Sequence, residues 1–284
     1  MKCDTKYDAD IKAHYDSVAE EEKDSGSSTM ADQFIRDKET AFVIDQVENF
    51  INRQVADYRE NGGFARGPGR HDEFSLIDVG CGNGYTLHKI FESFPSLSLA
   101  GVEFNAALGN IARERFKSID LPIYQGDLRS KTTLPDQKYD ILLCQRVLIN
   151  LLDVADQKAA LNNIVEMVNP GGLLIFMECF NSGLDNLNSA RQECGLPVLP
   201  PAHHNLYLPD DFFSHGNLSE YDCTQKHYLS THYFVSRVLH EDSLSKRKGE
   251  FIRNSHFVSF FSNAFPPSIG EYSPLRFLSF TKTH

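Results

Sequence analysis

The spacing of hydrophobic positions changes near residue 73 and divides the chain into two parts. Before this point, apolar residues recur at helical spacing over about residues 31–58, which predicts a helix with one buried face. After it, short runs rich in Leu, Ile and Val alternate with helical segments, a pattern typical of βαβ units and a parallel sheet. We therefore expect an N-terminal helical arm and linker over residues 1–72 and an α/β domain over residues 73–284.

The second part predicts a succession of short strands. They are expected at residues 75–80, 98–104, 122–127, 139–145 and 173–180, with helices between them at 84–94, 106–118 and 155–168. The segment NPGG at residues 169–172 is expected to make the turn after the last of these helices, because Pro ends a helix and Gly permits the turn. Two further strands are expected near residues 219–229 and 273–282.

Net charge is concentrated at the N-terminus. The chain has 28 Lys+Arg against 39 Asp+Glu, and its net charge of −11 divides into −7 for residues 1–50, −4 for residues 51–200 and zero for the rest. Non-specific binding to nucleic acid or anionic lipid needs a basic surplus, so we expect neither partner. The N-terminus is polar and no apolar run approaches the roughly 18 residues that span a bilayer, which predicts a cytoplasmic protein.

A glycine-rich segment, DVGCGNG, follows the first expected strand. Its glycines, within residues 80–84, would let backbone N–H groups approach a ligand. Their G-x-G-x-G spacing differs from the G-x-G-x-x-G of dinucleotide-binding proteins, which counts against NAD. Glu103 and Asp127 end the next two strands, so their carboxylates would share a crevice with the glycines. Glu103 could accept hydrogen bonds from a ribose diol and Asp127 from an amine. An adenosine matches that set of groups.

The segments DVGCGNG, VEF, QGDL and NPGG together resemble the class I S-adenosylmethionine-dependent methyltransferases over about residues 73–180. This resemblance implies a Rossmann-like, seven-stranded, mostly parallel sheet with helices on both faces and an antiparallel last strand. It also implies methyl transfer from S-adenosylmethionine to a small-molecule acceptor, with S-adenosylhomocysteine as the product. The residues expected to contact the cofactor are Asp78, Gly80, Cys81, Gly82, Asn83, Gly84, Glu103, Phe104, Asp127, Leu128, Gln145, Tyr15 and Arg36.

Within that set, the resemblance implies separate roles. Asp78 and the glycines would flank the methionine part of the cofactor, Glu103 would bind the ribose hydroxyls, and Asp127 with Leu128 would hold the adenine. The alternative is that the glycines make a tight turn and the two acids are solvated strand ends. The arm of residues 1–58 is either a lid over the cofactor or a surface helix with a polar tail.

The acceptor site is expected after the fourth strand and in cap insertions at about residues 181–217 and 229–270. We expect His204, Arg146 and Tyr207 to be catalytic, although Arg146 could pair with an acid elsewhere and histidines in a loop could be structural. The chain lacks the acidic cluster of metal-dependent catechol methyltransferases, so we expect no metal. The residues expected to bind the acceptor are Arg146, Asn150, His203, His204, Asn205, Tyr207, Tyr233 and Arg237.

The acceptor is expected to be an anionic or sugar-like metabolite that is methylated on oxygen. An alcohol or a protonated amine would need a general base, for which His204 is the first choice, whereas a carboxylate or phosphate oxygen would need only cationic positioning. The segments HHNLYL, STHYFVSRVL and GEYSPLRFLSF resemble, more weakly, a bacterial subgroup of small-molecule methyltransferases. The alternatives are an N-methyltransferase of a small amine, an NAD-dependent oxidoreductase and a non-catalytic cofactor-binding scaffold. A monomer and a homodimer both stay open.

Overall fold

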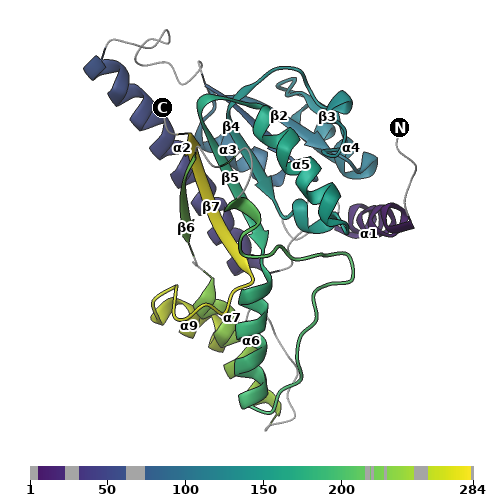
Figure 1. The fold of residues 1–284 in the computed structure, drawn as a ribbon, viewed down its shortest axis with the longest axis vertical. Coiled ribbons are helices and arrows are strands. Elements are labelled where there is room, and N and C mark those ends of the chain that lie inside the picture. The colour runs from purple at the N-terminus through teal and green to yellow at the C-terminus, as the bar shows by residue number, and fades with distance from the viewer. Residues whose placement is uncertain are drawn as a thin grey trace.

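The computed structural model describes residues 6–22, 32–61, 74–214, 218, 221–226, 229–245 and 255–282. These residues form a seven-stranded sheet in the order β3-β2-β1-β4-β5-β7-β6 (Figure 1). The strands are β1 Ser75–Val79, β2 Ser98–Glu103, β3 Ile123–Gln125, β4 Tyr139–Gln145, β5 Val168–Cys179, β6 Tyr221–Lys226 and β7 Leu275–Lys282.

The pairing pattern of the sheet brings several strand ends together. Strands β3, β2, β1, β4 and β5 pair in parallel, whereas β7 pairs antiparallel with both β5 and β6. The chain order reverses direction between β1 and β4, so the carboxyl ends of these strands meet at a topological switch point, where α/β proteins bind ligands. The predicted fold class, a mostly parallel Rossmann-like sheet with an antiparallel last strand, is confirmed.

Helices cover both faces of this sheet. In Figure 1, α5 lies in front of the sheet and α2 behind it, and α2 contacts both β5 and β7. The central strands are therefore buried on both sides, which explains their nearly continuous apolar sequences. The helices are α1 Lys6–Glu22, α2 Gln33–Asn61, α3 Tyr85–Ser93, α4 Ala106–Phe116, α5 Val154–Glu166, α6 Asn181–Glu193, α7 Ser230–Phe234, α8 His240–Ser245 and α9 His256–Ala264.

The segment NPGG does not make the predicted turn. Helix α5 ends at Glu166, and β5 has already begun at Val168, which pairs with Tyr139 on β4. The register between these strands then shifts, so that residues 169–172 form an irregular part of the strand, with Gly171 at a φ of 74°. The prediction was wrong because Pro and Gly are compatible with a bulge in a strand as well as with a turn.

Helix α1 lies at one end of the sheet, where it packs against α4. An ion pair of 2.8 Å joins Asp8 of α1 to Arg129, and the side-chain amide of Asn105 donates a hydrogen bond of 2.8 Å to Asp16. Most of the polar run at residues 21–30 and of the glycine-rich linker expected at residues 61–71 lies outside the described residues.

The helices that follow β5 extend beyond the carboxyl end of that strand, at the lower end of Figure 1. A buried network fastens this part to α2, because His232 of α7 lies 3.0 Å from both the Oδ2 of Asp32 and the Oγ of Ser262. Between α7 and α8 the chain makes a π-helical turn over Val235–Leu239. These residues connect the two parts expected from the sequence into one packed body.

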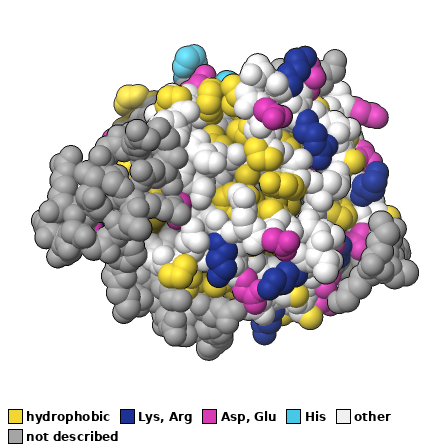
Figure 2. Space-filling model, turned by 90° about the horizontal axis from the view of Figure 1, so that it is seen from above, with side chains coloured by type: hydrophobic (Ala, Val, Ile, Leu, Met, Phe, Trp, Pro, Cys, Tyr) yellow, Lys and Arg dark blue, Asp and Glu magenta, His cyan; other side chains and the backbone are white. Residues whose placement is uncertain are grey.

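The charged side chains are of mixed sign on the face drawn in Figure 2, where Lys and Arg alternate with Asp and Glu around a group of hydrophobic side chains. Such a face does not concentrate positive potential. Within the described residues, no helix has both the length and the apolar character that a bilayer span requires.

Candidate active site

A cavity lies where the carboxyl ends of β1, β2 and β4 meet, beneath α1. Its empty space, including the solvent at its open mouth, is about 1290 Å³. Its walls come from distant parts of the sequence, namely α1, residues 78–86, residues 102–108, residues 126–129, residues 145–151 and residues 204–205.

Most of the residues predicted to bind the cofactor line this cavity, and Gly84 is the exception. Gly84 lies at the start of α3, packed so closely that a Cβ atom would come within 2.7 Å of the Phe116 ring. The predicted acceptor residues divide into two groups. Those that line the cavity are Arg146, Asn150, His204 and Asn205, and those that do not are His203, Tyr207, Tyr233 and Arg237.

The glycine loop after β1 is shaped for close backbone approach. Gly80 and Gly82 have φ angles of 77° and 57°, in the left-handed region that favours glycine. A Cβ atom at Gly80 would lie 2.3 Å from a methyl carbon of Val147, so the loop after β4 packs directly against this glycine. The loop is therefore fixed on both sides, with its backbone exposed to the cavity.

The Glu103 carboxylate is held by two backbone groups at the end of β2. It accepts hydrogen bonds of 2.7 Å from the N–H groups of Gly82 and Asn105. Burial raises its pKa, while these hydrogen bonds act in the opposite direction. A carboxylate has about four acceptor positions, so these two bonds fix its orientation and leave capacity for a ligand diol.

The Asp127 carboxylate is held by Arg129, a residue that the sequence analysis did not single out. The guanidinium donates to both carboxylate oxygens, with Nε at 3.0 Å from Oδ1 and Nη2 at 2.8 Å from Oδ2. The same side chain pairs with Asp8 of α1 and with Asp156 of α5, at 2.8 and 3.3 Å. Arg129 thus positions Asp127 and attaches α1 to this edge of the sheet.

Two arginines approach one buried acid at the other end of the cavity. Glu39 of α2 is fully buried, and its carboxylate lies 3.2 Å from the Nε of Arg146 and 3.8 Å from Nη1 of Arg36. Arg146 has a φ of 54° and also lines the cavity. Its position therefore agrees both with pairing to an acid elsewhere in the chain and with contact to a ligand in the cavity. Burial and the neighbouring Arg146 lower the pKa of Arg36 to about 10, which leaves it charged at neutral pH.

Asp78 lies between the glycine loop and Arg36. It is buried, lines the cavity, and its Oδ1 atom has no hydrogen-bond partner among the described residues. Burial and the nearby Glu103 raise its pKa to about 8, against the effect of Arg36. A buried carboxylate oxygen without a partner is costly unless a ligand satisfies it, which suits a cationic ligand group.

Glu178, near the end of β5, organises the loop that carries Arg146. Its Oε1 accepts from the N–H groups of Val147 and Leu148 at 2.9 and 3.0 Å, and its Oε2 accepts from Ile149 at 3.3 Å. Sequence reasoning missed this residue, although an acid inside the apolar run LLIFMEC was a visible signal. Burial raises its pKa to about 7.

We expect the Glu178→Gln variant to reveal this raised pKa. Because the folded carboxyl binds its proton more tightly than the unfolded one, its contribution to stability is complete below its ordinary pKa of 4.5 and is lost as pH rises towards 7. The wild type should therefore lose up to about 3 kcal/mol of unfolding free energy relative to the variant across that interval. Urea unfolding at several pH values measures this difference, and a constant difference would contradict it.

The remaining predicted acceptor residues lie in the cap. The guanidinium of Arg237 stacks on the ring of Tyr233 at 4.2 Å, and its Nη2 lies 3.7 Å from Asp32. Burial raises the pKa of Tyr207, and so do the neighbouring Cys179 and Tyr233. His204 differs from these residues, because it lines the cavity and its Nδ1 is buried without a hydrogen-bond partner among the described residues.

Residues 76–172 match the family model described as a methyltransferase domain. This segment is similar to methyltransferase domains. The predicted resemblance to the class I enzymes is thereby confirmed for the part of the chain that forms β1 to β4, α3 to α5 and the start of β5.

Two curated relatives are malonyl-[acyl-carrier protein] O-methyltransferases. That of Priestia megaterium is 22% identical over 156 residues, 53% of this chain and 52% of the relative. That of Yersinia pestis is 26% identical over 140 residues, 49% of this chain and 48% of the relative. The chain therefore matches about half the length of these relatives.

A similar solved structure is that of CalS10 with S-adenosylmethionine bound, an amino pentose methyltransferase from Micromonospora echinaspora. It is 26% identical, with a TM-score of 0.37, and the match covers 49% of each chain.

The segment that matches the family model supplies only part of the cavity wall. Tyr15 and Arg36 precede residues 76–172, and His204 and Asn205 follow them, yet all four line the same cavity as Glu103. The walls that the family model covers carry most of the residues predicted to hold the cofactor, together with Arg146 and Asn150 of the predicted acceptor set. The walls outside it carry residues from both predicted sets.

Proposed function

We propose that this chain is an S-adenosylmethionine-dependent methyltransferase that methylates an oxygen atom of a small anionic acceptor. The observation that supports this best is the single cavity that joins the glycine loop and Glu103 to the paired arginines Arg36 and Arg146. One end of the cavity offers acceptors for an adenosine, and the other offers cations for carboxylates.

The cofactor fits the stretch of the cavity from Asp127 to Arg36 by the chemistry of its residues. Glu103 would accept from the ribose hydroxyls, and Asp127 with Leu128 would hold the adenine. The unpartnered Oδ1 of Asp78 would accept from the ammonium group of the methionine part, and Arg36 would pair with its carboxylate. When bound, S-adenosylmethionine would supply an electrophilic methyl group on its sulfonium.

The acceptor would lie at the second end, against Arg146, Asn150, His204 and Asn205. The Asn150 amide donates a hydrogen bond of 2.7 Å to the Tyr15 hydroxyl, which closes this end with α1 and limits the access of water. Arg146 would orient an anionic oxygen, and such an oxygen is already nucleophilic without a base. The names of the curated relatives, O-methyltransferases of a malonyl group, support oxygen as the methylated atom.

His204 is suited to accept a proton if the acceptor is an alcohol. Burial and the neighbouring His14 lower its pKa to about 4, so its imidazole is neutral at neutral pH. A neutral imidazole can act as a general base, although one with so low a pKa is a weak one. This arrangement favours an anionic acceptor over an alcohol, and the positive arginines favour it over the small amine that an N-methyltransferase would need.

A transfer assay tests this function. Labelled S-adenosylmethionine is incubated with the full chain and with matched sets of small carboxylates, sugars and amines. We expect label in base-labile methyl esters of one or more carboxylates. Label only in amines would overturn the choice of acceptor, and thermal stabilisation by NAD but not by S-adenosylhomocysteine would favour an oxidoreductase instead.

The raised pKa of Asp78 predicts how cofactor affinity depends on pH. Between pH 6 and about 8, affinity for S-adenosylhomocysteine should rise with pH, because binding to the ligand ammonium requires the ionised carboxylate and Asp78 ionises only near pH 8. In Asp78→Asn the affinity should be lower and nearly independent of pH over this interval. Calorimetry at several pH values measures both, and equal slopes for the two proteins would contradict the assignment.

A further inference from the structure

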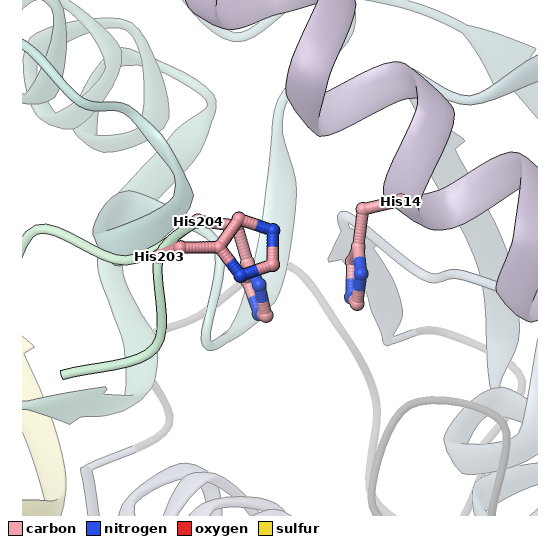
Figure 3. A group of neighbouring side chains, drawn as sticks. All are labelled: His14, His203 and His204. Carbon is pink, nitrogen blue, oxygen red and sulfur yellow. The ribbon is translucent and has the colours of Figure 1, made fainter. Parts of the chain in front are cut away.

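Three histidines from distant parts of the chain come together at the mouth of the cavity. His14 lies on α1, and His203 and His204 lie in the loop that follows α6 (Figure 3). Each offers a ring nitrogen, and these atoms all lie within 4.8 Å of one another. The proposed methyl transfer uses only His204 of this cluster, and it does not explain why the other two are beside it.

The composition of the cluster suits metal coordination, because a neutral imidazole has a free lone pair that can bind a metal ion. The buried Nδ1 of His204 has no hydrogen-bond partner among the described residues, so it lacks the contact that a metal ion would provide.

We propose that His14, His203 and His204 bind one divalent transition metal ion of the zinc type, which fastens α1 to the loop over the cavity. Three imidazole ligands with an open fourth position are a common arrangement for zinc, and imidazole is preferred by zinc, copper and nickel rather than by magnesium or calcium. The expectation of no metal rested on the missing acidic cluster, which concerns oxygen ligands and does not bear on imidazoles.

The three nitrogens must come closer together to bind one ion. Nitrogen ligands at about 2.0–2.1 Å from a tetrahedral ion lie about 3.4 Å apart, somewhat closer than the limit of 4.8 Å found here. The rings of His14 and His204 are stacked, with centroids 4.0 Å apart and planes at 19°, so each must turn until its nitrogen points at the ion. His203 is exposed and approaches edge-on to His204, which leaves it room to complete the set.

Binding of the ion would control access to the cavity. Without it, α1 is fastened by the contacts of Asp8, Asp16 and Tyr15, and the metal would add a link to the loop that carries His203 and His204. It would also occupy the imidazole of His204. The metal site itself does not depend on the proposed function, because its ligands and its effect on α1 can be measured without cofactor or acceptor.

Zinc titration of the full chain by calorimetry tests the proposal directly. We expect one zinc ion per wild-type chain. The affinity for zinc should be weaker by about 100-fold or more in His14→Ala and in His203→Ala, since replacing even a residue that only supports a metal ligand lowers metal affinity by about 10–100-fold. His88→Ala is the matched control, because His88 lies on α3 beside Glu92 and away from the cluster. Its affinity for zinc should equal that of the wild type.

Hydrogen exchange gives the second measurement. Zinc should slow the exchange of α1 amides in the wild type and in His88→Ala but not in His203→Ala. Unchanged zinc affinity in both cluster variants would overturn the site, and zinc binding without slower exchange in α1 would overturn the link. If S-adenosylhomocysteine fails to bind while zinc binds as described, the proposed function fails and the metal site stands.

Discussion

Replacing Glu103 with alanine is expected to weaken binding of S-adenosylhomocysteine by about 100-fold. The proposed ribose diol would lose two hydrogen bonds to a carboxylate, and bonds to charged groups contribute about 1.5–3 kcal/mol each. Even the low end of that sum corresponds to about two orders of magnitude in the dissociation constant. Calorimetric titration of the variant and the wild type at the same pH measures the change.

The controls for this variant must separate the loss of ligand contacts from a change in the structure of the glycine loop. Glu103 also holds the N–H groups of Gly82 and Asn105, so thermal unfolding should accompany the titration to show that the variant is folded. Glu92→Ala removes an exposed carboxylate from α3 and should bind the ligand as the wild type does. A folded Glu103→Ala protein with affinity within threefold of the wild type would contradict the assignment of the ribose site.

Replacing Arg146 with methionine is expected to lower kcat/KM for a carboxylate acceptor by about 100-fold, while affinity for S-adenosylhomocysteine changes by no more than a few-fold. Arg146 lies after β4, next to Asn150, whereas Arg36 is the arginine near Asp78. Loss of the charge that orients the acceptor therefore affects the transfer step and leaves the cofactor contacts in place. Steady-state kinetics and calorimetry measure the two effects separately.

Among the described residues, this variant leaves Glu39 with the more distant Arg36 as its cationic partner, and removal of one partner of a buried pair costs about 3–5 kcal/mol. In the double variant Glu39→Gln with Arg146→Met the carboxylate that Arg146 pairs with is gone as well, so a protein shown to be folded by thermal unfolding should still not recover kcat/KM. Arg53→Met, on an exposed position of α2, is the control for loss of an arginine. Normal kcat/KM in the folded double variant would contradict the role of Arg146.

The strand ends that form the cavity could be predicted from the sequence because the signals are local. A run of apolar residues predicts each parallel strand, and an acid at or just after its end, such as Glu103 or Asp127, lies at the shared carboxyl edge. The glycine loop follows the same logic, since its φ angles require glycine whatever packs around it. The segment NPGG shows the limit, because the same residues suit a turn and an irregular strand.

The residues that sequence reasoning missed act through partners far away in the chain. Arg129 joins Asp127 to Asp8 on α1, and Glu39 on α2 pairs with Arg146 after β4. The spacing of hydrophobic residues in the sequence does not indicate such pairs, because each side chain alone resembles an ordinary surface charge. Their positions depend on how α1 and α2 pack against the sheet, which hydrophobic spacing does not specify.

The cap illustrates the same difficulty within one loop. His204 and His203 are neighbours in sequence, yet only His204 lines the cavity, and Tyr207 faces Cys179 and Tyr233 instead. The course of residues 194–210 depends on contacts such as the N–H of Leu206 donating to the carbonyl of Ile149 at 2.7 Å. Contacts of this kind decide which side chains of a long loop reach a site.

The most direct test of the central claim is a calorimetric titration of the wild-type chain with S-adenosylhomocysteine at pH 8, where about half of Asp78 is ionised. A parallel titration with NAD provides the comparison. The account predicts one S-adenosylhomocysteine bound per chain and no measurable binding of NAD. Absence of binding by S-adenosylhomocysteine, or saturable binding of NAD that excludes it, would contradict the assignment of this cavity.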